Sequence, residues 1–418
     1  MGVAEVDITP TTPIPLAGFA ARLGPFEGID RRLRLRAAWF SVGDDHAMLV
    51  TADILWWPPE RADDLRAAIA RRWPVPEAHI VLHATHTHGA PQPSTVFTPS
   101  LGQPDPAWID RLTGGLLDAV AAAWDARQPA IVERGRGTTR IGLNRRALRG
   151  EDPADQIDRE VIVLRIATPV GDPLAVLIHH ACHPTTTGNP RVTSEFPGVM
   201  SERVAAALGD GVVVGFLQGC CGDINPRVTI DRDKRPLGDA EVAQMGEELA
   251  TDALRVLDGP LAPVAIDHIT ARSRTAMLPV RHVPTESELR ARLDAPGITG
   301  EWARHMLAHP ERLAPTIPVA ISHLRLGDGL GFLAMAAEVT TPYGLAIKAA
   351  TNHRTLPLPY SNGMTGYVIT DVQLAAGGYE SVESTPYFAL PSPFAPGVEA
   401  AMTGAITDAL TEQERTAS

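Results

Sequence analysis

Five short apolar runs in this chain each lead to a charged or metal-binding side chain. They are His46–Val50 before Asp53, Ile80–Leu82 before His83-Ala84-Thr85-His86-Thr87-His88-Gly89, Leu174–Ile178 before His179-His180-Ala181-Cys182-His183-Pro184, Val212–Leu217 before Gly222-Asp223-Ile224-Asn225-Pro226, and Gly331–Ala336 before Glu338. Continuous apolar runs of this length are typical of strands that are buried on both faces. Because open α/β sheets place ligands outside the carboxyl ends of their strands, the pattern predicts one site assembled from distant segments.

Strand-like and helix-like segments alternate through residues 1–260. We expect helices at Glu60–Trp73, Trp108–Arg127 and Asp239–Leu257. The last of these carries apolar side chains at helical spacing, which predicts a face packed on a core. This alternation predicts an α/β fold in which a mixed sheet is covered by helices.

The pattern changes after Pro260, where residues 261–418 form a β-rich part. Strands are expected at Pro263–Thr270 and Ile317–Leu326, with a tight hairpin at 326–330. Between them, residues 284–315 indicate polar helices broken by prolines and are a possible lid. No flexible linker separates the two parts, and candidate ligands lie on both sides of Pro260. We therefore expect one catalytic domain that spans residues 1–418.

Bulk properties exclude several classes of function. A net charge of −12 and a pI near 5.6 argue against a nucleic-acid-binding surface and leave a small molecule as the expected substrate. No apolar stretch approaches the ~20 residues that a membrane span needs. The first ten residues lack the basic and apolar regions of a secretion signal. The three cysteines form no disulfide framework. We expect a cytoplasmic protein.

The histidine-rich segments make zinc the leading candidate for a bound metal. If the strand before them continued to residue 88, its period of two would put His86 and His88 on one face. A single histidine here would more often be a structural residue, but three within six residues favour a functional site. His183 precedes Pro184, which biases it toward an extended conformation at a strand end. Glu338 follows an apolar run, where its charge needs a metal or a cationic partner.

The cysteines and the polar residues near them have two interpretations. Cys220 and Cys221 lie between glycines, where a thiol can act as a nucleophile or can pack in a tight turn, and we favour packing. Cys182 is expected to pack as well. Asp223 and Asn225 can orient water or substrate, or can be turn residues.

Together these motifs resemble the catalytic domain of the neutral (non-lysosomal) ceramidases, which are zinc-dependent amidases. The resemblance extends from Val6-Asp7-Ile8-Thr9-Pro10 to Tyr379-Glu380, and its most specific element is Ala84-Thr85-His86-Thr87-His88-Gly89. Further matches, in the family's order, are Asn144-Arg145, His183-Pro184, Gly222-Asp223-x-x-Pro226, Glu338-Val339-Thr340-Thr341 and Gly366-Tyr367.

The resemblance implies which residues form the site. By matching position, one zinc ion per chain would be held by His86, His183, Glu338 and Tyr367. The residues that would surround the substrate carbonyl are His88, Arg145 and Tyr379.

This chain departs from the family pattern at a serine that is proposed to be catalytic. Asn225 occupies that position, which excludes a serine nucleophile there and leaves an amide that can position substrate. Gly89 likewise replaces the serine that closes the family's histidine motif.

We therefore expect a ceramidase-like, zinc-dependent hydrolase that acts on the C–N bond of a linear carboxamide through a metal-activated water, with a related ester or lactone as a possible substrate. Aromatic residues make up only 5% of the chain, so we expect a substrate smaller than ceramide. Two alternatives stay open: a metal-independent cysteine hydrolase using Cys220 or Cys221, and a non-catalytic binding protein that contains a metal.

Overall fold

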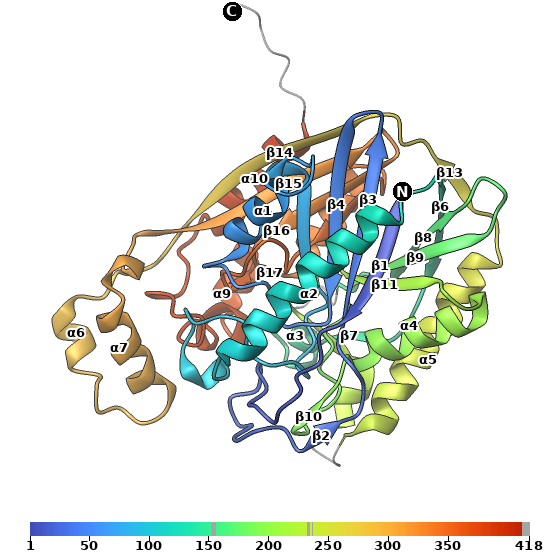
Figure 1. The fold of residues 1–418 in the computed structure, drawn as a ribbon. Helices are drawn as coiled ribbons and strands as arrows, with labels where there is room; N and C mark the ends of the chain where they lie inside the picture. The colour runs from blue at the N-terminus through green and yellow to red at the C-terminus, as the bar shows by residue number, and fades with distance from the viewer. Residues whose placement is uncertain (152–155, 232–234, 236, 412–418) are drawn as a thin grey trace, which may run out of the picture.

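The computed structural model describes residues 1–151, 156–231, 235 and 237–411 of the 418-residue chain. Its core is built from three mixed sheets (Figure 1). The first has the order β1-β3-β4-β5. Its strands are β1 (Gly2–Asp7), β3 (Arg34–Val42), β4 (Asp45–Ala52) and β5 (Ile80–Ala84). β4 and β5 run parallel, so their carboxyl ends meet at one edge.

The second sheet has the order β11-β9-β8-β6-β13. Its strands are β6 (Ile131–Thr138), β8 (Glu160–Ala167), β9 (Pro173–His180), β11 (Val213–Gln218) and β13 (Ala262–Val264). β9 and β11 are parallel, which brings the ends of two more of the apolar runs together. Because β13 pairs with β6, residues on both sides of Pro260 share this sheet.

The third sheet has the order β14-β15-β16-β18. Its strands are β14 (Ile269–Pro279), β15 (Thr316–Leu326), β16 (Leu330–Met335) and β18 (Thr355–Leu358). Three short strand pairs complete the set: β17 (Glu338–Val339) with β19 (Tyr367–Val368), β12 (Ile224–Pro226) with β7 (Gly142–Asn144), and β10 (Arg191–Val192) with β2 (Gly28–Ile29).

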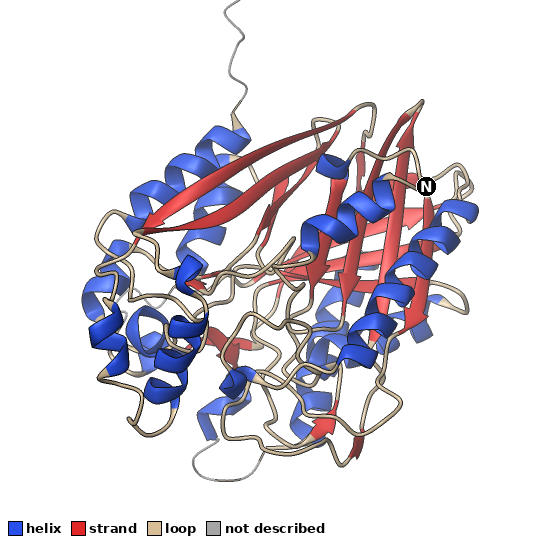
Figure 2. Ribbon diagram, turned by 60° about the vertical axis from the view of Figure 1, so that its left-hand side comes forward, coloured by secondary structure: helices blue, strands red, loops and turns tan. Residues whose placement is uncertain are grey.

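The second sheet packs against the other two, with a common apolar layer between them. That layer takes side chains from all three sheets, among them Leu49, Leu164 and Phe332. Polar links also cross it, since Thr51 Oγ1 donates to the carbonyl of Phe216 at 2.6 Å. Strands therefore occupy the interior and helices the outside (Figure 2). Each central strand is buried by a sheet on one face and by other segments on the second face.

Helices cover the outer faces of the sheets. α1 (Ala62–Ala70) and α2 (Pro106–Asp125) pack on the first sheet, α4 (Glu195–Leu208) and α5 (Asp239–Leu257) on the second, and α10 (Val398–Leu410) on β14 and β15. α6 (Glu286–Arg290) and α7 (Ile298–Ala308) lie at the left of the molecule in Figure 1, far from α4 and α5. The remaining α-helices are α3 (Arg145–Leu148), α8 (Thr341–Ala350) and α9 (Asp371–Ala376). Within the described ranges, no helix combines the length and apolarity that a bilayer crossing requires.

The predicted α/β class with mixed, helix-covered sheets is confirmed. The expected amphipathic helix at 239–257 begins and ends where predicted, and its apolar stripe is buried. One predicted element is wrong, because residues 263–270 do not form a single strand. β13 ends at Val264 and β14 begins at Ile269 in a different sheet, so the chain crosses between sheets at 265–268. The predicted hairpin at 326–330 joins β15 to β16.

Candidate metal centre

The histidine-rich segment leaves the sheet before it reaches His86 and His88. β5 ends at Ala84, and His86 has a φ of 65°, in the left-handed region that few non-glycine residues adopt. Strand alternation to residue 88, the premise of the sequence prediction, is therefore wrong. The turn instead directs Nδ1 of His86 to the carbonyl of Leu55 at 2.7 Å. His86 is almost fully buried.

His83, the first histidine of the cluster, has a structural role. Its Nδ1 lies 2.8 Å from Ser361 Oγ, and its Nε2 accepts from the backbone N–H of Gln218 at 2.8 Å. Both ring nitrogens are thus used in holding β5 to its neighbours. Burial lowers the pKa of His83 to about 3, so the ring is neutral.

His183 follows the end of β9 and is held by the turn after β11. Its backbone N–H donates to the carbonyl of Ile224 at 2.9 Å, and its Nδ1 lies 2.6 Å from the carbonyl of Cys221. The opposite ring nitrogen, Nε2, lies 2.6 Å from Oε1 of Glu338. The turn therefore fixes the direction in which this imidazole points.

Glu338 and Tyr367 are neighbours because β17 and β19 pair in parallel. The two residues are direct partners in the register, and Glu338 N–H donates to the carbonyl of Gly366 at 2.8 Å. Both side chains are buried. Burial alone would raise the pKa of Glu338, but His86 and His183 outweigh it and hold that pKa well below its usual range. Burial, with Glu338 nearby, raises the pKa of Tyr367 well above its usual value.

The donor chemistry of this cluster fits a bound cation. Carbonyl oxygens only accept, so the bonds to Leu55 and Cys221 place the proton of each neutral imidazole on Nδ1. The Nε2 atoms of His86 and His183 then carry lone pairs, and they lie 3.4 and 2.6 Å from the same carboxylate oxygen of Glu338. With both imidazoles neutral, these three atoms are all acceptors and no proton lies between them, whereas a protonated imidazole would donate from Nε2 to Glu338. An ion that accepts nitrogen and carboxylate ligands resolves this conflict, and zinc is such an ion.

His88 adds a third imidazole to the group. Ligand atoms of His86, His88 and His183 all lie within 4.8 Å of one another, so these histidines could hold a metal ion. Both ring nitrogens of His88 are buried without a hydrogen-bond partner in the described structure. Burial, reinforced by its histidine neighbours, lowers the pKa of His88 well below the usual value. Its ring is tilted against Phe19, with centroids 4.8 Å apart.

Arg145 connects the cluster to the rest of the site. Its Nε donates to Glu380 at 2.6 Å, its NH1 to Oδ1 of Asn225 at 3.1 Å, and its NH2 to the carbonyl of Gly222 at 2.7 Å and to the hydroxyl of Tyr367 at 3.0 Å. A guanidinium has five N–H groups, and these bonds use four. One N–H of NH1 is left for a ligand.

Tyr379 lies beside the same guanidinium. Its ring meets that of Tyr367 edge to face, with centroids 5.8 Å apart, and the Arg145 guanidinium carbon is 5.6 and 5.8 Å from the two rings. Burial raises the pKa of Tyr379 to about 12, so its hydroxyl keeps its proton at neutral pH. The structure thus brings into one region the seven residues that the resemblance assigns to the site, together with Asn225.

Asp223 and the cysteines take structural positions. Oδ1 of Asp223 accepts from the backbone N–H and the hydroxyl of Thr341, both at 2.8 Å, and Oδ2 accepts from Gln373 at 3.0 Å. This carboxylate therefore holds the start of α8. All three cysteines are free and buried, and burial raises the pKa of each thiol well above its usual value.

Sequence reasoning missed Tyr360. Its ring stacks on His86, and its hydroxyl lies 3.1 Å from Sγ of Cys221. The chain has only five tyrosines, and that scarcity, which drew attention to Tyr367 and Tyr379, applied equally to Tyr360.

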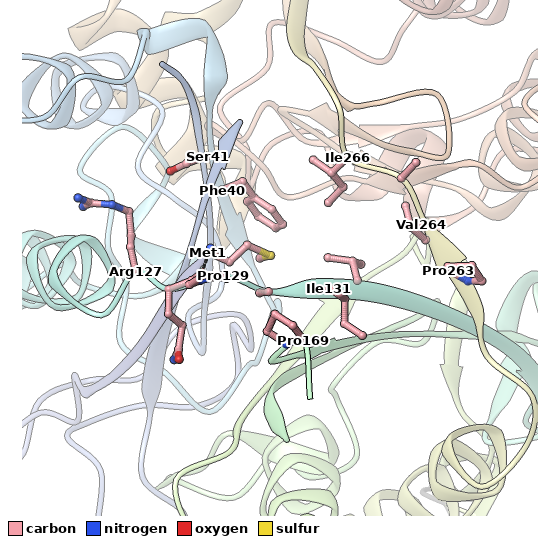
Figure 3. A pocket seen from close by; sticks show the side chains of 14 residues that line it. Met1, Phe40, Ser41, Arg127, Pro129, Ile131, Pro169, Pro263, Val264 and Ile266 are labelled. Carbon is pink, nitrogen blue, oxygen red and sulfur yellow. Dashed lines mark hydrogen bonds between the residues drawn. The ribbon is translucent and has the colours of Figure 1, made fainter. Parts of the chain in front are cut away.

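A cavity of about 750 Å³ lies away from this cluster, beside the first residues of the chain. Figure 3 shows Phe40 on one side and Ile131 and Pro169 on the other, with Arg127 at the edge pointing outward. It contains none of the site residues. We therefore place the chemistry at the histidine cluster.

No family model and no curated protein matches the chain. Solved structures of ceramidases are similar to the chain. A neutral ceramidase from Pseudomonas aeruginosa is 19% identical, with a TM-score of 0.78, and the match covers 98% of this chain and 73% of that one. A ceramidase complexed with C2 is 17% identical, also with a TM-score of 0.78, and the match covers 98% of this chain and 74% of the other. The chain therefore has the neutral ceramidase fold.

Proposed function

We propose that this protein is a zinc-dependent hydrolase that cleaves a carboxamide, or a related ester or lactone, smaller than ceramide. The observation that carries the proposal is that Nε2 of His86 and Nε2 of His183 converge on the same carboxylate oxygen of Glu338, while both Nδ1 atoms are directed at backbone carbonyls. The fold, shared with proteins described as ceramidases, supports an amide substrate.

Tyr367 is our proposed fourth ligand. It lies opposite Glu338 in the register of the paired strands, and its hydroxyl accepts a hydrogen bond from Arg145, which stabilises negative charge on that oxygen. His88 is the competing fourth ligand, because its ring nitrogens lie close to those of the other two histidines. We assign His88 to the substrate instead, since no hydrogen bond in the described structure fixes its ring for coordination.

Zinc bound here would polarise a substrate carbonyl and lower the pKa of water from 15.7 toward ~7. The protein groups do the rest. The remaining N–H of Arg145 would donate to the carbonyl oxygen of the substrate, where negative charge develops. Loss of one such donor typically lowers the rate by ~10²–10³. Asn225 accepts from Arg145 through its Oδ1, which leaves its amide N–H groups for substrate.

Proton transfer is assigned to two residues. Tyr379 can donate its hydroxyl proton to the developing negative charge or to the leaving group. His88 has two unpartnered ring nitrogens and can accept a proton on one while donating from the other. Asp223 is not available as a base, because its oxygens are occupied by Thr341 and Gln373.

The cysteine alternative has little support from the geometry. A nucleophilic cysteine needs its thiolate, and burial stabilises the neutral thiol of both Cys220 and Cys221. The non-catalytic alternative does not account for Arg145, Asn225 and Tyr379. These residues surround the cluster but are not needed merely to bind a metal.

The test is elemental analysis of freshly purified protein, followed by a screen of short-chain amides, esters and lactones with and without a chelator. We expect about one zinc per chain and hydrolysis that the chelator abolishes and added zinc restores. Full activity in chelator, lost on thiol alkylation, would favour the cysteine enzyme. A zinc-loaded protein inert on the whole panel would favour the binding protein.

A further inference from the structure

A second pocket adjoins the proposed catalytic residue His88. It has a volume of about 520 Å³, and its walls include Phe19, Arg22, Thr186 and Asn189. Phe19 contacts the ring of His88, and NH2 of Arg22 donates to the backbone carbonyl of His88 at 2.6 Å. Phe19 and Arg22 therefore line this pocket and also contact His88.

Arg22 is the only charged side chain in the wall of this pocket as far as the described residues go. NH2 donates to the backbone carbonyls of Ala17 and His88, and NH1 makes one long bond of 3.4 Å to the carbonyl of Asn189. Nε is buried without a partner. All of its partners are neutral carbonyls, and no ion pair with a carboxylate is found for it in the described structure. NH1 keeps donor capacity for a ligand.

The guanidinium of Arg22 is partly buried, and partial burial without an ion-pair partner is unfavourable to the fold. Burial lowers the pKa of Arg22 to about 10, with no carboxylate nearby to oppose that effect. Two fully buried arginines have such partners: Arg36 pairs with Asp53, and Arg146 with Glu380. The partly buried Arg312 also donates to backbone carbonyls, but the charges of Glu311 and Glu60 oppose the effect of burial on its pKa. A charge that is buried without a partner generally has a functional reason. A ligand anion would supply the missing charge.

The charge balance identifies the anion. Arg22 offers one positive charge and the remaining donor capacity of NH1, which matches the single negative charge of a carboxylate. A phosphate would bring an additional negative charge that this pocket does not neutralise.

We propose that Arg22 binds a carboxylate of the substrate, so that the preferred substrates are amides with a carboxylate close to the scissile bond, as in N-acyl amino acids. This proposal rests on the proposed hydrolase function, because it places the amide at His88 and the carboxylate at Arg22. It makes Arg22 the residue that determines specificity for a charged substrate.

The test compares two matched amides: N-hexanoylglycine, and N-hexanoyl isobutylamine, in which a neutral isopropyl group replaces the carboxylate. The corresponding ketones, with CH2 in place of the amide N–H, cannot be hydrolysed and report binding alone by calorimetry. The proteins are the metal-loaded wild type, Arg22→Gln, Arg22→Lys and Arg191→Gln. Arg191 is a control of equal charge: it follows the wall residue Pro190, but it does not itself line the pocket, and its side chain pairs with Asp30.

We expect wild type and Arg191→Gln to prefer the carboxylate in both binding and kcat/KM by about 10- to 100-fold, as for a charge-assisted hydrogen bond. Arg22→Gln should abolish that preference while binding the neutral ketone as wild type does. Arg22→Lys keeps the positive charge and should therefore retain part of the preference for the carboxylate.

Three results decide the proposal. Equal binding of the two ketones by wild type would overturn it, even if both amides are hydrolysed. A preference retained in Arg22→Gln would also overturn it, since the carboxylate would then be binding elsewhere, for example to the metal. A preference in ketone binding that depends on Arg22, without hydrolysis of either amide, would support the carboxylate site and refute the hydrolase.

Discussion

Tyr360 stacks on the imidazole of His86, with ring centroids 4.0 Å apart and an angle of 22° between the planes. The other constraint on His86 is the bond from its Nδ1 to the carbonyl of Leu55. Together they fix the plane and the tautomer of the ring, so that Nε2 points at Glu338. Metal sites depend on such supporting contacts, whose loss typically costs ~10–100-fold in metal affinity or activity.

Tyr360→Leu should therefore weaken zinc binding by about 10- to 100-fold, because the stacking surface is lost while much of the volume is kept. Tyr360→Phe retains the ring and should change the affinity by less than about threefold. Competition with a chromophoric chelator measures both. If the Phe variant lost as much affinity as the Leu variant, the hydroxyl near Cys221 and not the stacked ring would be the important group.

His183→Ala should remove most of the bound zinc, because it deletes a lone pair aimed at Glu338 and leaves that carboxylate without a neighbour at 2.6 Å. Cys221→Ala is the matched control. It removes a nearby thiol but keeps the backbone carbonyl that orients His183. Elemental analysis should find near wild-type zinc in this control. Wild-type zinc in His183→Ala would contradict the ligand assignment.

Arg145→Ala should lower kcat by ~10²–10³ with less effect on zinc content. The fold should survive, because Glu380 keeps its bonds to Arg146 at 2.6 Å and to Arg149 at 3.1 Å. Steady-state kinetics and metal analysis on the same samples separate the two effects. An unchanged kcat at full zinc content would remove the proposed role at the carbonyl oxygen.

Gly18→Ala tests the position of His88 without altering a polar group. Gly18 has a φ of 92°, and a Cβ added there would lie only 2.3 Å from Nδ1 of His88. The imidazole must move, and a displacement of about 1 Å can cost ~10²-fold in rate. Gly24→Ala is matched, since its φ is 78° but nothing lies within 4 Å of the added atom. We expect a large fall in kcat/KM for the first variant only, and equal losses would show that backbone strain is responsible.

The sequence predicted the positions of the strands more accurately than the segments that pack on each face of them. Buried apolar runs such as 213–217 are strands, but an apolar run indicates burial on both faces without saying what covers each face. Here one face is covered by another sheet, which no local pattern reveals. The convergence of His86, His183 and Glu338 followed from strand ends and from the resemblance. The way in which His86 reaches the cluster did not, because it depends on a left-handed backbone after Ala84 that the loop imposes.

Two further features lay beyond sequence reasoning for a related reason. Tyr360 also has a left-handed backbone, with a φ of 57°, and its contact with His86 joins segments more than 270 residues apart in sequence. Arg22 is one of many arginines in the chain, and its partial burial against the backbone carbonyls of Ala17 and His88 arises only when the chain folds. Both features arise from tertiary packing and leave no periodic signal.

Glu380 should make the free energy of unfolding decrease as the pH becomes acidic. Burial alone would raise its pKa, but Arg145, Arg149 and Arg146 lower it to about 2. Because the pKa is lower in the folded state, ionised Glu380 stabilises the fold fully at pH values above its ordinary pKa near 4.3. This stabilisation is lost as the pH falls from there to about 2. The difference corresponds to ~3 kcal/mol in the free energy of unfolding.

We therefore expect Glu380→Gln to be less stable than wild type at pH 7 and to lose less stability between pH 5 and pH 2, as measured by urea midpoints at each pH. Zinc release at low pH affects both proteins and cancels in the comparison. Glu286→Gln is the control, because Glu286 pairs with Arg290 on an exposed helix surface, where solvent screens the pair. If the stability of Glu380→Gln fell as steeply between pH 5 and pH 2 as that of wild type, other carboxylates would determine the stability in acid.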